Sequence, residues 1–341
     1  MNKSILVNMS KLNQKYLLSG IVIFIITSVV LISGCVQQST ETIGTQTNDT
    51  EINQEIIPTN TSELTNKLSN WTKEKGTRIS GISSSTIIKD SQYLMYYTGK
   101  GIELAKSLDG LNFEYIGQII DMNDIDGVDM VTNPAVFQTK DNSYRMLFEG
   151  SRWVEDEKDG GHQTDRKLYS AASTDGLNWV MENGVRFWDY GDGKPGEIFT
   201  SVPDIISLPD NRLRMYYTRG ATSATALSDD EGLTWTKETD LKLRKVAIDL
   251  DIVLLNDSTY KLFFTTFENE FGFGDQWVMS ASSTDGINFI IDEDKIIEPS
   301  TPNGLITDPD VIKTDNGYRM YYGEFRKGEY ESNILSAFST G

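Results

Sequence analysis

A unit of about 54 residues, repeated from residue 70 to the end of the chain, constrains the fold more than any other feature. Its clearest part is a segment rich in aromatic residues and methionine, present as QYLMYYTG from Gln92, SYRMLFEG from Ser143, RLRMYYTRG from Arg212, YKLFFTTF from Tyr260 and GYRMYYGE from Gly317. Side chains alternate with a period of two, which is typical of a β-strand. The repeat therefore predicts five copies of one β-sheet unit.

A turn motif follows the next strand of the unit. It has the form Ser-x-Asp-Gly-x-Asn-aromatic and is seen as SLDGLNF from Ser107, STDGLNW from Ser173 and STDGINF from Ser283, while SDDEGLTW from Ser228 resembles the Asp-box of sialidase-like propellers. Asp side chains bind the backbone of such turns and Gly supplies a positive φ. We expect these aspartates to be structural.

The two ends of the repeat region complement each other. The fifth copy stops at SAFSTG, Ser336 to Gly341, without a fourth strand, whereas NWTKE from Asn70 resembles TWTKE from Thr234. Pairing the N-terminal segment with the last copy removes an exposed sheet edge. The sequence predicts an all-β domain over residues 70–341, a five-bladed β-propeller closed by an N-terminal strand that contains Trp71 and pairs with residues 334–339.

The pattern of the first 69 residues predicts an export signal followed by a tether. Residues 17–32 are apolar and uncharged, follow Lys11 and Lys15, and precede Ser33, Gly34 and Cys35. This resembles the lipobox of prokaryotic lipoproteins, which implies a signal peptide over residues 1–34 and a lipid on Cys35. An uncleaved signal-anchor helix is the alternative. Residues 35–69 are polar and predict a disordered tether, with the domain on the extracytoplasmic face of the membrane.

Composition excludes several classes of function. The formal charge is 31 − 50 = −19, which argues against a nucleic-acid partner. The chain has one cysteine and one histidine, His162, which argues against a zinc site with Cys and His ligands and against a Ser-His-Asp triad. We expect a monomer without a cofactor or metal, although the acidic run from Asp121 to Asp129 could give oxygens to Ca²⁺.

The segments predicted to line the centre carry a family resemblance. NPAV from Asn133, VPDI from Val202 and DPDV from Asp308, together with the aromatic strands and the turns, look like the five-bladed glycoside hydrolases of families 43 and 32: arabinanases, β-xylosidases, invertases and levansucrases. The resemblance covers residues 70–341 and implies a carbohydrate ligand. It also implies an Asp base or nucleophile, a pKa-tuning Asp and a Glu acid at the starts of the first three blades.

The chain departs from that pattern at all three places. Ser83 to Ser85 stand in the first blade, Asn133 replaces the second Asp, and Ser201-Val202-Pro203 replaces Glu-x-Pro in the third. Acids appear instead in the last two blades, at Asp249, Asp251, Asp308 and Asp310.

Three functions stay open on this evidence. In the first, the protein is a surface-tethered glycoside hydrolase whose catalytic carboxyl groups stand at other positions than in the family. Asp308 and Asp249, on adjacent blades, are the catalytic aspartates, and Glu197 is the proton donor. In the second, the channel binds a glycan without cleaving it. In the third, the propeller is a scaffold for protein interactions.

Further residues are candidates for binding the substrate. Asn133 and Asp204 lie where first strands begin, whereas Trp153 and Trp188 lie in two segments, residues 151–166 and 188–199, that we expect to be long loops. Aromatic rings there would stack on sugar rings. Arg152 and Arg219 would hold a carboxylated sugar.

Overall fold

The computed structural model describes Leu68 and residues 70–155, 162–191, 199–220, 222–255, 258–268, 274–292, 295–326 and 332–341. The predictions for the signal peptide, Cys35, most of the tether and Glu197 therefore lie outside the described residues. Within these ranges, none of the helical structure is long and apolar enough to cross a bilayer.

Consecutive strands form antiparallel groups of similar layout. Group one contains β3 (Ile82–Lys89), β4 (Gln92–Thr98), β5 (Ile102–Ser107) and β6 (Glu114–Ile120), and a 3₁₀ turn, η1 (Met122–Asp124), follows it. Group two contains β7 (Met130–Gln138), β8 (Tyr144–Glu155), β9 (His162–Ser173) and β10 (Val180–Phe187). Group three contains β11 (Thr200–Ser207), β12 (Leu213–Arg219), β13 (Thr222–Ser228) and β14 (Thr236–Asp240).

The last two groups share one sheet. Group four contains β15 (Ile248–Leu254), β16 (Tyr260–Phe267), β17 (Gln276–Ser283) and β18 (Ile290–Ile291), and group five contains β19 (Gly304–Thr314), β20 (Gly317–Arg326) and β21 (Asn333–Ser339). A single parallel pair, Gln276 with Leu305, joins them. The predicted alternation of strands and turns is present throughout.

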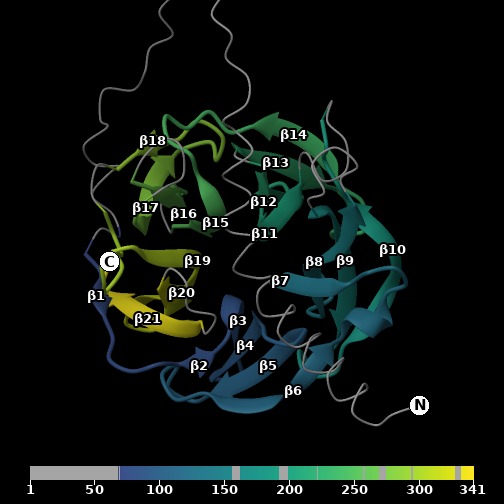
Figure 1. Cartoon of the computed structure of the whole chain (residues 1–341), viewed down its shortest axis with the longest axis horizontal. Coiled ribbons are helices and arrows are strands. Elements are labelled where there is room, and N and C mark those ends of the chain that lie inside the picture. The colour runs from purple at the N-terminus through teal and green to yellow at the C-terminus, as the bar shows by residue number, and fades with distance from the viewer. Residues whose placement is uncertain are drawn as a thin grey trace, which may run out of the picture.

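The groups stand around a common centre, with β3, β7, β11, β15 and β19 innermost (Figure 1). The apolar cores lie between neighbouring groups: one cluster packs Leu147 and Leu168 of group two against Met215 of group three. Another packs Met95 of group one against Tyr321 of group five, so the first and last groups also share a core.

An Arg-Glu clamp recurs in the outer half of the groups. Arg145 pairs with Glu182 through two contacts of 2.8 and 2.9 Å, and Arg214 pairs with Glu238 through two contacts of 2.8 Å. Each arginine also donates to a turn carbonyl of the following group, which is Glu231 for Arg145 and, at 3.0 Å, Asp285 for Arg214. The clamp thus links strands within a group and neighbouring groups to each other.

The N-terminal segment takes the outer place in group five. β1 (Thr72–Lys73) pairs with Phe338 and Ala337 of β21, and β2 (Ile79–Ser80) pairs with Ile334 and Asn333. Glu74 then forms the clamp with Arg319 at 2.9 and 3.1 Å. Glu74 is therefore the counterpart of Glu238, as the match between the two sequence segments suggests.

Trp71 lies one residue before β1, not inside the strand as predicted. Its ring is half-buried, meets Phe263 edge-on with centroids 5.7 Å apart, and donates from Nε1 to the carbonyl of Leu68 at 2.8 Å. Trp71 thus packs against group four, and the pairing with β21 begins only at Thr72.

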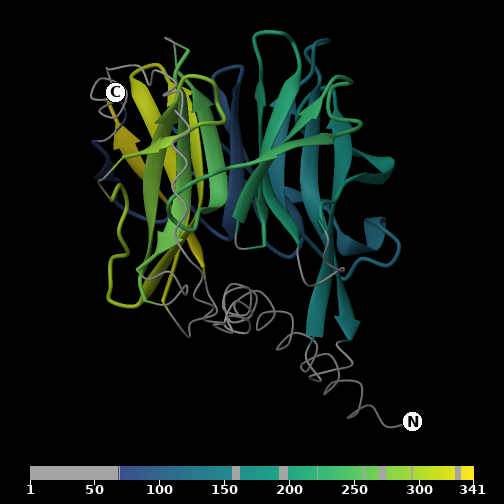
Figure 2. The same ribbon diagram turned by 90° about the horizontal axis from the view of Figure 1, so that it is seen from above.

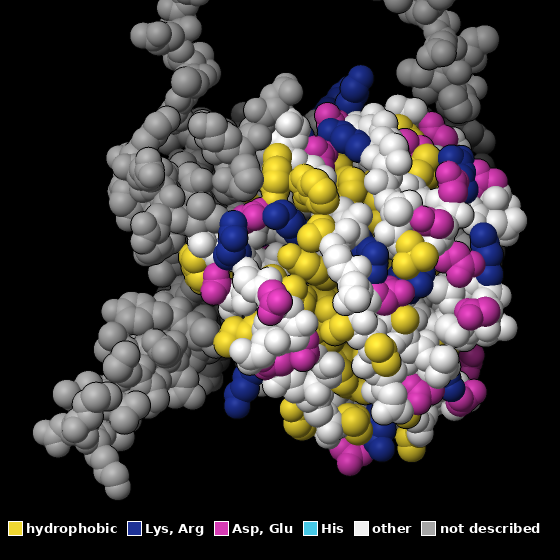
Figure 3. All heavy atoms as spheres, turned by 90° about the vertical axis from the view of Figure 1, so that its right-hand side faces the viewer, with side chains coloured by type: hydrophobic (Ala, Val, Ile, Leu, Met, Phe, Trp, Pro, Cys, Tyr) yellow, Lys and Arg dark blue, Asp and Glu magenta, His cyan; other side chains and the backbone are white. Residues whose placement is uncertain are grey.

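The segment expected to be a long loop at residues 151–166 is mostly strand. β8 continues to Glu155 and β9 begins at His162, with antiparallel pairing up to that pair of residues. The resulting hairpin extends beyond the rest of the body (Figure 2). On the outer face nearest to β10, acidic and basic side chains are interspersed among polar and apolar ones (Figure 3).

Candidate functional site

The innermost strand of every group contains a bulge near its start. At each bulge one residue has a left-handed backbone: Ser83 (φ 52°), Asn133 (54°), Val202 (46°), Asp249 (51°) and Asp308 (48°). This region is costly for residues other than Gly and most costly for a β-branched one such as Val202. Strain of this kind clusters at functional sites. Five strained positions at one level mark the centre as the candidate site.

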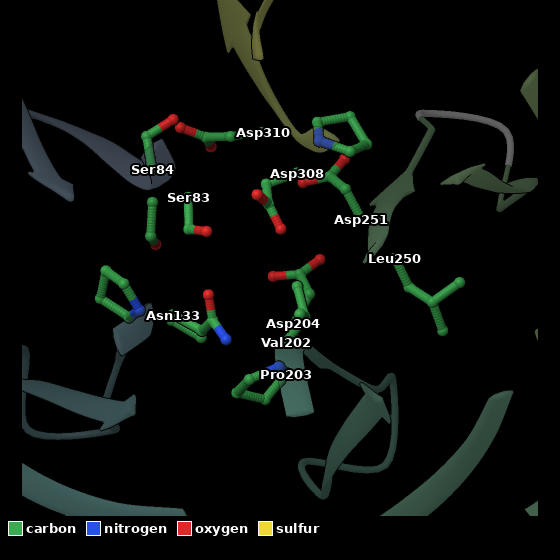
Figure 4. Close-up of a pocket in the computed structure, with 14 residues that line it drawn as sticks. Ser83, Ser84, Asn133, Val202, Pro203, Asp204, Leu250, Asp251, Asp308 and Asp310 are labelled. Carbon is green, nitrogen blue, oxygen red and sulfur yellow. The ribbon is translucent and has the colours of Figure 1, made fainter. Parts of the chain in front are cut away.

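A pocket opens between these bulges. It is lined by residues 83–85, 133–135, 202–204, 250–251 and 308–310. The carboxyl groups of Asp308 and Asp204, the hydroxyl of Ser83 and the amide of Asn133 point toward its middle (Figure 4). The fold thus brings three predicted residues together here: Asn133, Asp204 and Asp308.

In four of the five groups, the side chain two residues after the left-handed residue accepts a hydrogen bond from the next group, whereas group two has Ala135 at that position. Ser85 accepts from the Val136 nitrogen at 2.9 Å, Asp204 from Ile252 at 2.7 Å, Asp251 from Val311 at 3.1 Å and Asp310 from Thr86 at 3.3 Å. We call Ser85, Asp204, Asp251 and Asp310 the belt. Because their oxygens accept from backbone nitrogens, the belt acids have a structural role. The part of Asp204 in substrate binding stays a prediction, since Asp204 also lines the pocket.

Burial raises the pKa of the carboxyl groups in the belt. It raises the pKa of Asp310 to about 6, against hydrogen bonds from Thr86 and Ser84 that lower it. Burial and the charge of Asp310 raise the pKa of Asp204, and burial and the charges of Asp204 and Asp310 raise that of Asp251.

Asp249 and Asp308 form a second acid pair at the bulges themselves. The Asp249 carboxylate accepts from Thr265 Oγ1 at 2.7 Å, from Gln276 Nε2 at 3.4 Å and from the backbone nitrogen of Asp308. Burial raises the pKa of Asp249, and these hydrogen bonds oppose the rise. Burial and the charge of Asp249 raise the pKa of Asp308. The pair therefore favours a proton on Asp308 and a charge on Asp249.

Glu149 is a central residue that the sequence analysis missed. It is 1% exposed, lies on β8 opposite Thr132, and accepts from Ser151 Oγ at 2.7 Å. Its partner is Arg166 on β9, with Nε 3.6 Å from Oε1. The signal was present, since the other copies of the strand carry Thr98, Thr218, Thr265 and Gly323 where this one carries Glu.

The remaining predicted residues do not line the pocket. Arg152 lies 3.8 Å from Asp165, and Arg219 lies 3.0 Å from Asp189, so both arginines have acidic neighbours. Trp153 and Trp188 are exposed, at 41% and 52%. Their part in substrate binding stays a prediction.

The acidic run proposed for Ca²⁺ binds its own backbone. Asp121 accepts from the Asn123 nitrogen at 2.9 Å and Asp124 accepts from the Asp121 nitrogen at 2.7 Å, which forms a capping box on η1. Within the described ranges, no group of three or more His, Cys, Asp or Glu side chains is arranged to hold a metal ion.

No family model matches the chain, and no curated protein matches it. Several solved structures are similar to this chain in fold. A thermostable family-43 glycoside hydrolase has a TM-score of 0.59 at 12% identity, covering 78% of this chain and 92% of its own. The α-L-arabinanase of Cellvibrio cellulosa with arabinohexaose has a TM-score of 0.56 at 12% identity, covering 76% and 92%.

A β-1,3-galactosidase of family 43 with galactodeoxynojirimycin is similar in the same way, with a TM-score of 0.57, 13% identity and coverage of 77% and 93%. At such identities the likeness establishes the fold alone. The chain has the all-β propeller fold found in glycoside hydrolases of this type.

Proposed function

We propose that this protein is a glycoside hydrolase whose acid pair is Asp308 and Asp249. The observation that carries the proposal is the pair itself: the carboxyl of Asp308 lines the pocket, and the carboxylate of Asp249, which accepts from the Asp308 nitrogen and is not among the lining residues, raises the pKa of Asp308. Glycoside cleavage needs one carboxyl that is protonated and one that is ionised. The fold of the similar structures supports the same reaction class.

In this mechanism Asp308 donates its proton to the glycosidic oxygen as the bond to the anomeric carbon breaks. Asp249 either attacks the anomeric carbon or takes a proton from the attacking water, and the carboxyl separation in the sugar complex decides between these routes. Water supplies the hydroxyl of the new reducing end, and the protons balance without a cofactor. Asp308 thus takes the role first predicted for Glu197, which lies outside the described residues.

The test is turnover of aryl glycosides by the full-length protein. The panel contains p-nitrophenyl α-L-arabinofuranoside and β-D-galactoside, which correspond to the arabinanase and the galactosidase among the similar structures, and p-nitrophenyl β-D-xyloside. Asp308→Asn should abolish release of nitrophenol, whereas Asp210→Asn, an exposed carboxyl paired with Arg212, should not change it. Turnover that survives Asp308→Asn contradicts the assignment.

A specific observation favours a second function, binding of a glycan without cleavage. The first three bulges carry Ser83, Asn133 and Val202, so the acids implied by the resemblance are absent from those positions. Binding on a glycan array by wild-type protein, without turnover of any aryl glycoside, would support this alternative.

We propose further that the domain is a five-bladed β-propeller over residues 70–341, each group being one blade. Its support is the belt, in which Asp310 of group five reaches Thr86 of group one, and the Glu74 to Arg319 clamp. Residues 72–74 would then complete the fifth blade.

The proposed setting is the extracytoplasmic face of the membrane, with a monomer held by a lipid on Cys35, a signal peptide over residues 1–34 and a tether over residues 35–69. Cys35→Ser should abolish metabolic labelling by a fatty-acid or isoprenoid probe. Unchanged labelling would contradict this anchor.

A further inference from the structure

Glu149 breaks a pattern that the other groups keep. On the second strand of each group, one residue pairs with the residue just before the bulge; in chain order these are Thr98, Glu149, Thr218, Thr265 and Gly323. Threonine fits there in three groups, where Thr98 Oγ1 accepts from Asn133 N, Thr218 Oγ1 accepts from Asp249 N, and Thr265 Oγ1 donates to Asp249. The fold therefore does not require a charge at this place.

The carboxylate of Glu149 is nevertheless buried, and both of its oxygens have hydrogen-bond partners. Its carboxylate accepts from Ser151 Oγ at 2.7 Å, from Asn133 Nδ2 at 3.1 Å and from Ser201 Oγ, and lies 3.6 Å from Arg166 Nε. Arg166 is itself buried and stacks over Phe199, with its guanidinium carbon 4.2 Å from the ring centroid. A buried ion pair is seldom more stable than a neutral replacement that packs well, so stability does not account for it.

The contacts of Glu149 set the orientation of Asn133. The amide nitrogen of Asn133 donates to Glu149 Oε2 at 3.1 Å and to Ser201 Oγ at 3.3 Å. With both amide hydrogens directed there, the amide oxygen faces the middle of the pocket (Figure 4). That oxygen accepts hydrogen bonds and cannot donate one.

We propose that Glu149, supported by Arg166, is a positioning residue that holds the Asn133 amide oxygen as the acceptor for a hydroxyl group of a neutral sugar. This inference rests on the proposed carbohydrate site. It also names the ligand class, because an acceptor oxygen that faces the same pocket as the carboxyls of Asp204 and Asp308 disfavours a carboxylated sugar. A uronic acid would place a further negative charge among these carboxyls.

The test is a double-mutant cycle in the full-length protein, measured as kcat/KM on the aryl glycoside that is turned over. Asn133→Ala and Glu149→Thr should each lower kcat/KM by roughly tenfold, the worth of one hydrogen bond to a neutral group. The double variant should be no worse than Asn133→Ala, because Glu149 acts through Asn133. Glu149→Gln keeps an acceptor for the Asn133 amide and should recover most of the loss, and Glu114→Gln, an exposed carboxylate on β6, serves as control.

Thermal unfolding separates positioning from a structural role. Glu149→Thr removes the carboxylate that pairs with the buried guanidinium of Arg166 and should lower the melting temperature, whereas Glu149→Gln keeps an acceptor there and should unfold closer to wild type. Additive losses in the cycle, or a folded Glu149→Gln protein that loses as much turnover as Glu149→Thr, would overturn the inference. So would faster turnover of a p-nitrophenyl glucuronide than of the matching xyloside. The proposed function fails separately, at the wild type, if that protein neither cleaves nor binds any sugar, and the inference falls with it.

Discussion

Buried carboxyl groups crowd the centre of the molecule. Those of Asp204, Asp249, Asp251, Asp308 and Asp310 all have a raised pKa, with burial as the main cause. The folded state holds these protons to a higher pH than the unfolded chain does. Stability from these groups is therefore complete below the ordinary Asp value of 3.8 and is lost as pH rises through the folded values. Turn aspartates act oppositely, because hydrogen bonds hold the pKa of Asp109 and Asp175 well below the usual range.

Because the central and the turn aspartates change stability with pH in opposite directions, the free energy of unfolding should be largest near pH 4 to 5. The free energy of unfolding, measured with urea at pH 4.5, 6 and 8, should fall toward pH 8. Asp310→Asn should reduce that fall by an amount on the order of 2 kcal/mol, since the pKa of Asp310 rises from 3.8 to about 6 and part of the effect lies below pH 4.5. A wild-type protein that becomes more stable between pH 4.5 and pH 8 would contradict the sign.

Val202 offers a test of backbone strain. Its φ of 46° is unfavourable for a β-branched residue, whereas Asn tolerates this region and occupies it at Asn133. Val202→Asn should raise the free energy of unfolding by about 1 kcal/mol. Val136→Asn, at a half-buried strand position outside the left-handed region, should instead lower it. A loss of stability at both positions would show that packing at Val202 outweighs strain.

Sequence reasoning found part of the site at this scale. Asn133 and Asp308 were identified because they start equivalent segments of the repeat. The left-handed backbone was not foreseen, because a bulge depends on pairing with a second strand. The hydrogen bond of Asp204 was not foreseen, since its partner, the nitrogen of Ile252, comes from the next group. Glu149 was overlooked because it stands among aromatic core residues.

At the scale of elements, the turns are the most predictable parts. Asp175 accepts from the nitrogens of Leu177 and Asn178, each at 2.8 Å, and Gly176 has the positive φ (75°) that the motif predicts. Local contacts within a few residues can be read from a single segment of sequence. The β8–β9 hairpin could not be predicted, because residues 151–166 are mostly polar and charged, have no apolar face of period two, and resemble a loop.

The turns can be shown to be structural by substitution. Asp175→Ala should lower the free energy of unfolding by about 1 to 2 kcal/mol, the worth of two hydrogen bonds to backbone nitrogens, and leave turnover unchanged. Asp126→Ala, an exposed acid in another loop, should have little effect on stability. Loss of turnover in a folded Asp175→Ala protein would argue for a part in the chemistry instead.

At the scale of the whole molecule, the N-terminal segment joins the two ends of the repeat. Deleting residues 70–76 removes β1, the half-buried ring of Trp71, worth roughly 1 to 2 kcal/mol on transfer, and the carboxylate of Glu74. Loss of Glu74 also leaves the guanidinium of Arg319 without its acidic partner. Deletion of 70–76 should lower the melting temperature and promote aggregation, whereas deletion of residues 36–66 should be nearly neutral. Equal melting temperatures would contradict this role.

The clamp between Glu74 and Arg319 joins residues 245 positions apart in the chain. Synthesis at about 5 to 20 residues per second separates their appearance by roughly 12 to 50 s. During that interval the strand at Thr72–Lys73 lacks the partner that it has in the fold, since β21 comes last among the described strands. The final hydrogen bonds of the domain thus connect nearly its oldest and its newest residues, and a nascent chain that stalls before residue 333 exposes two edges instead of a finished domain.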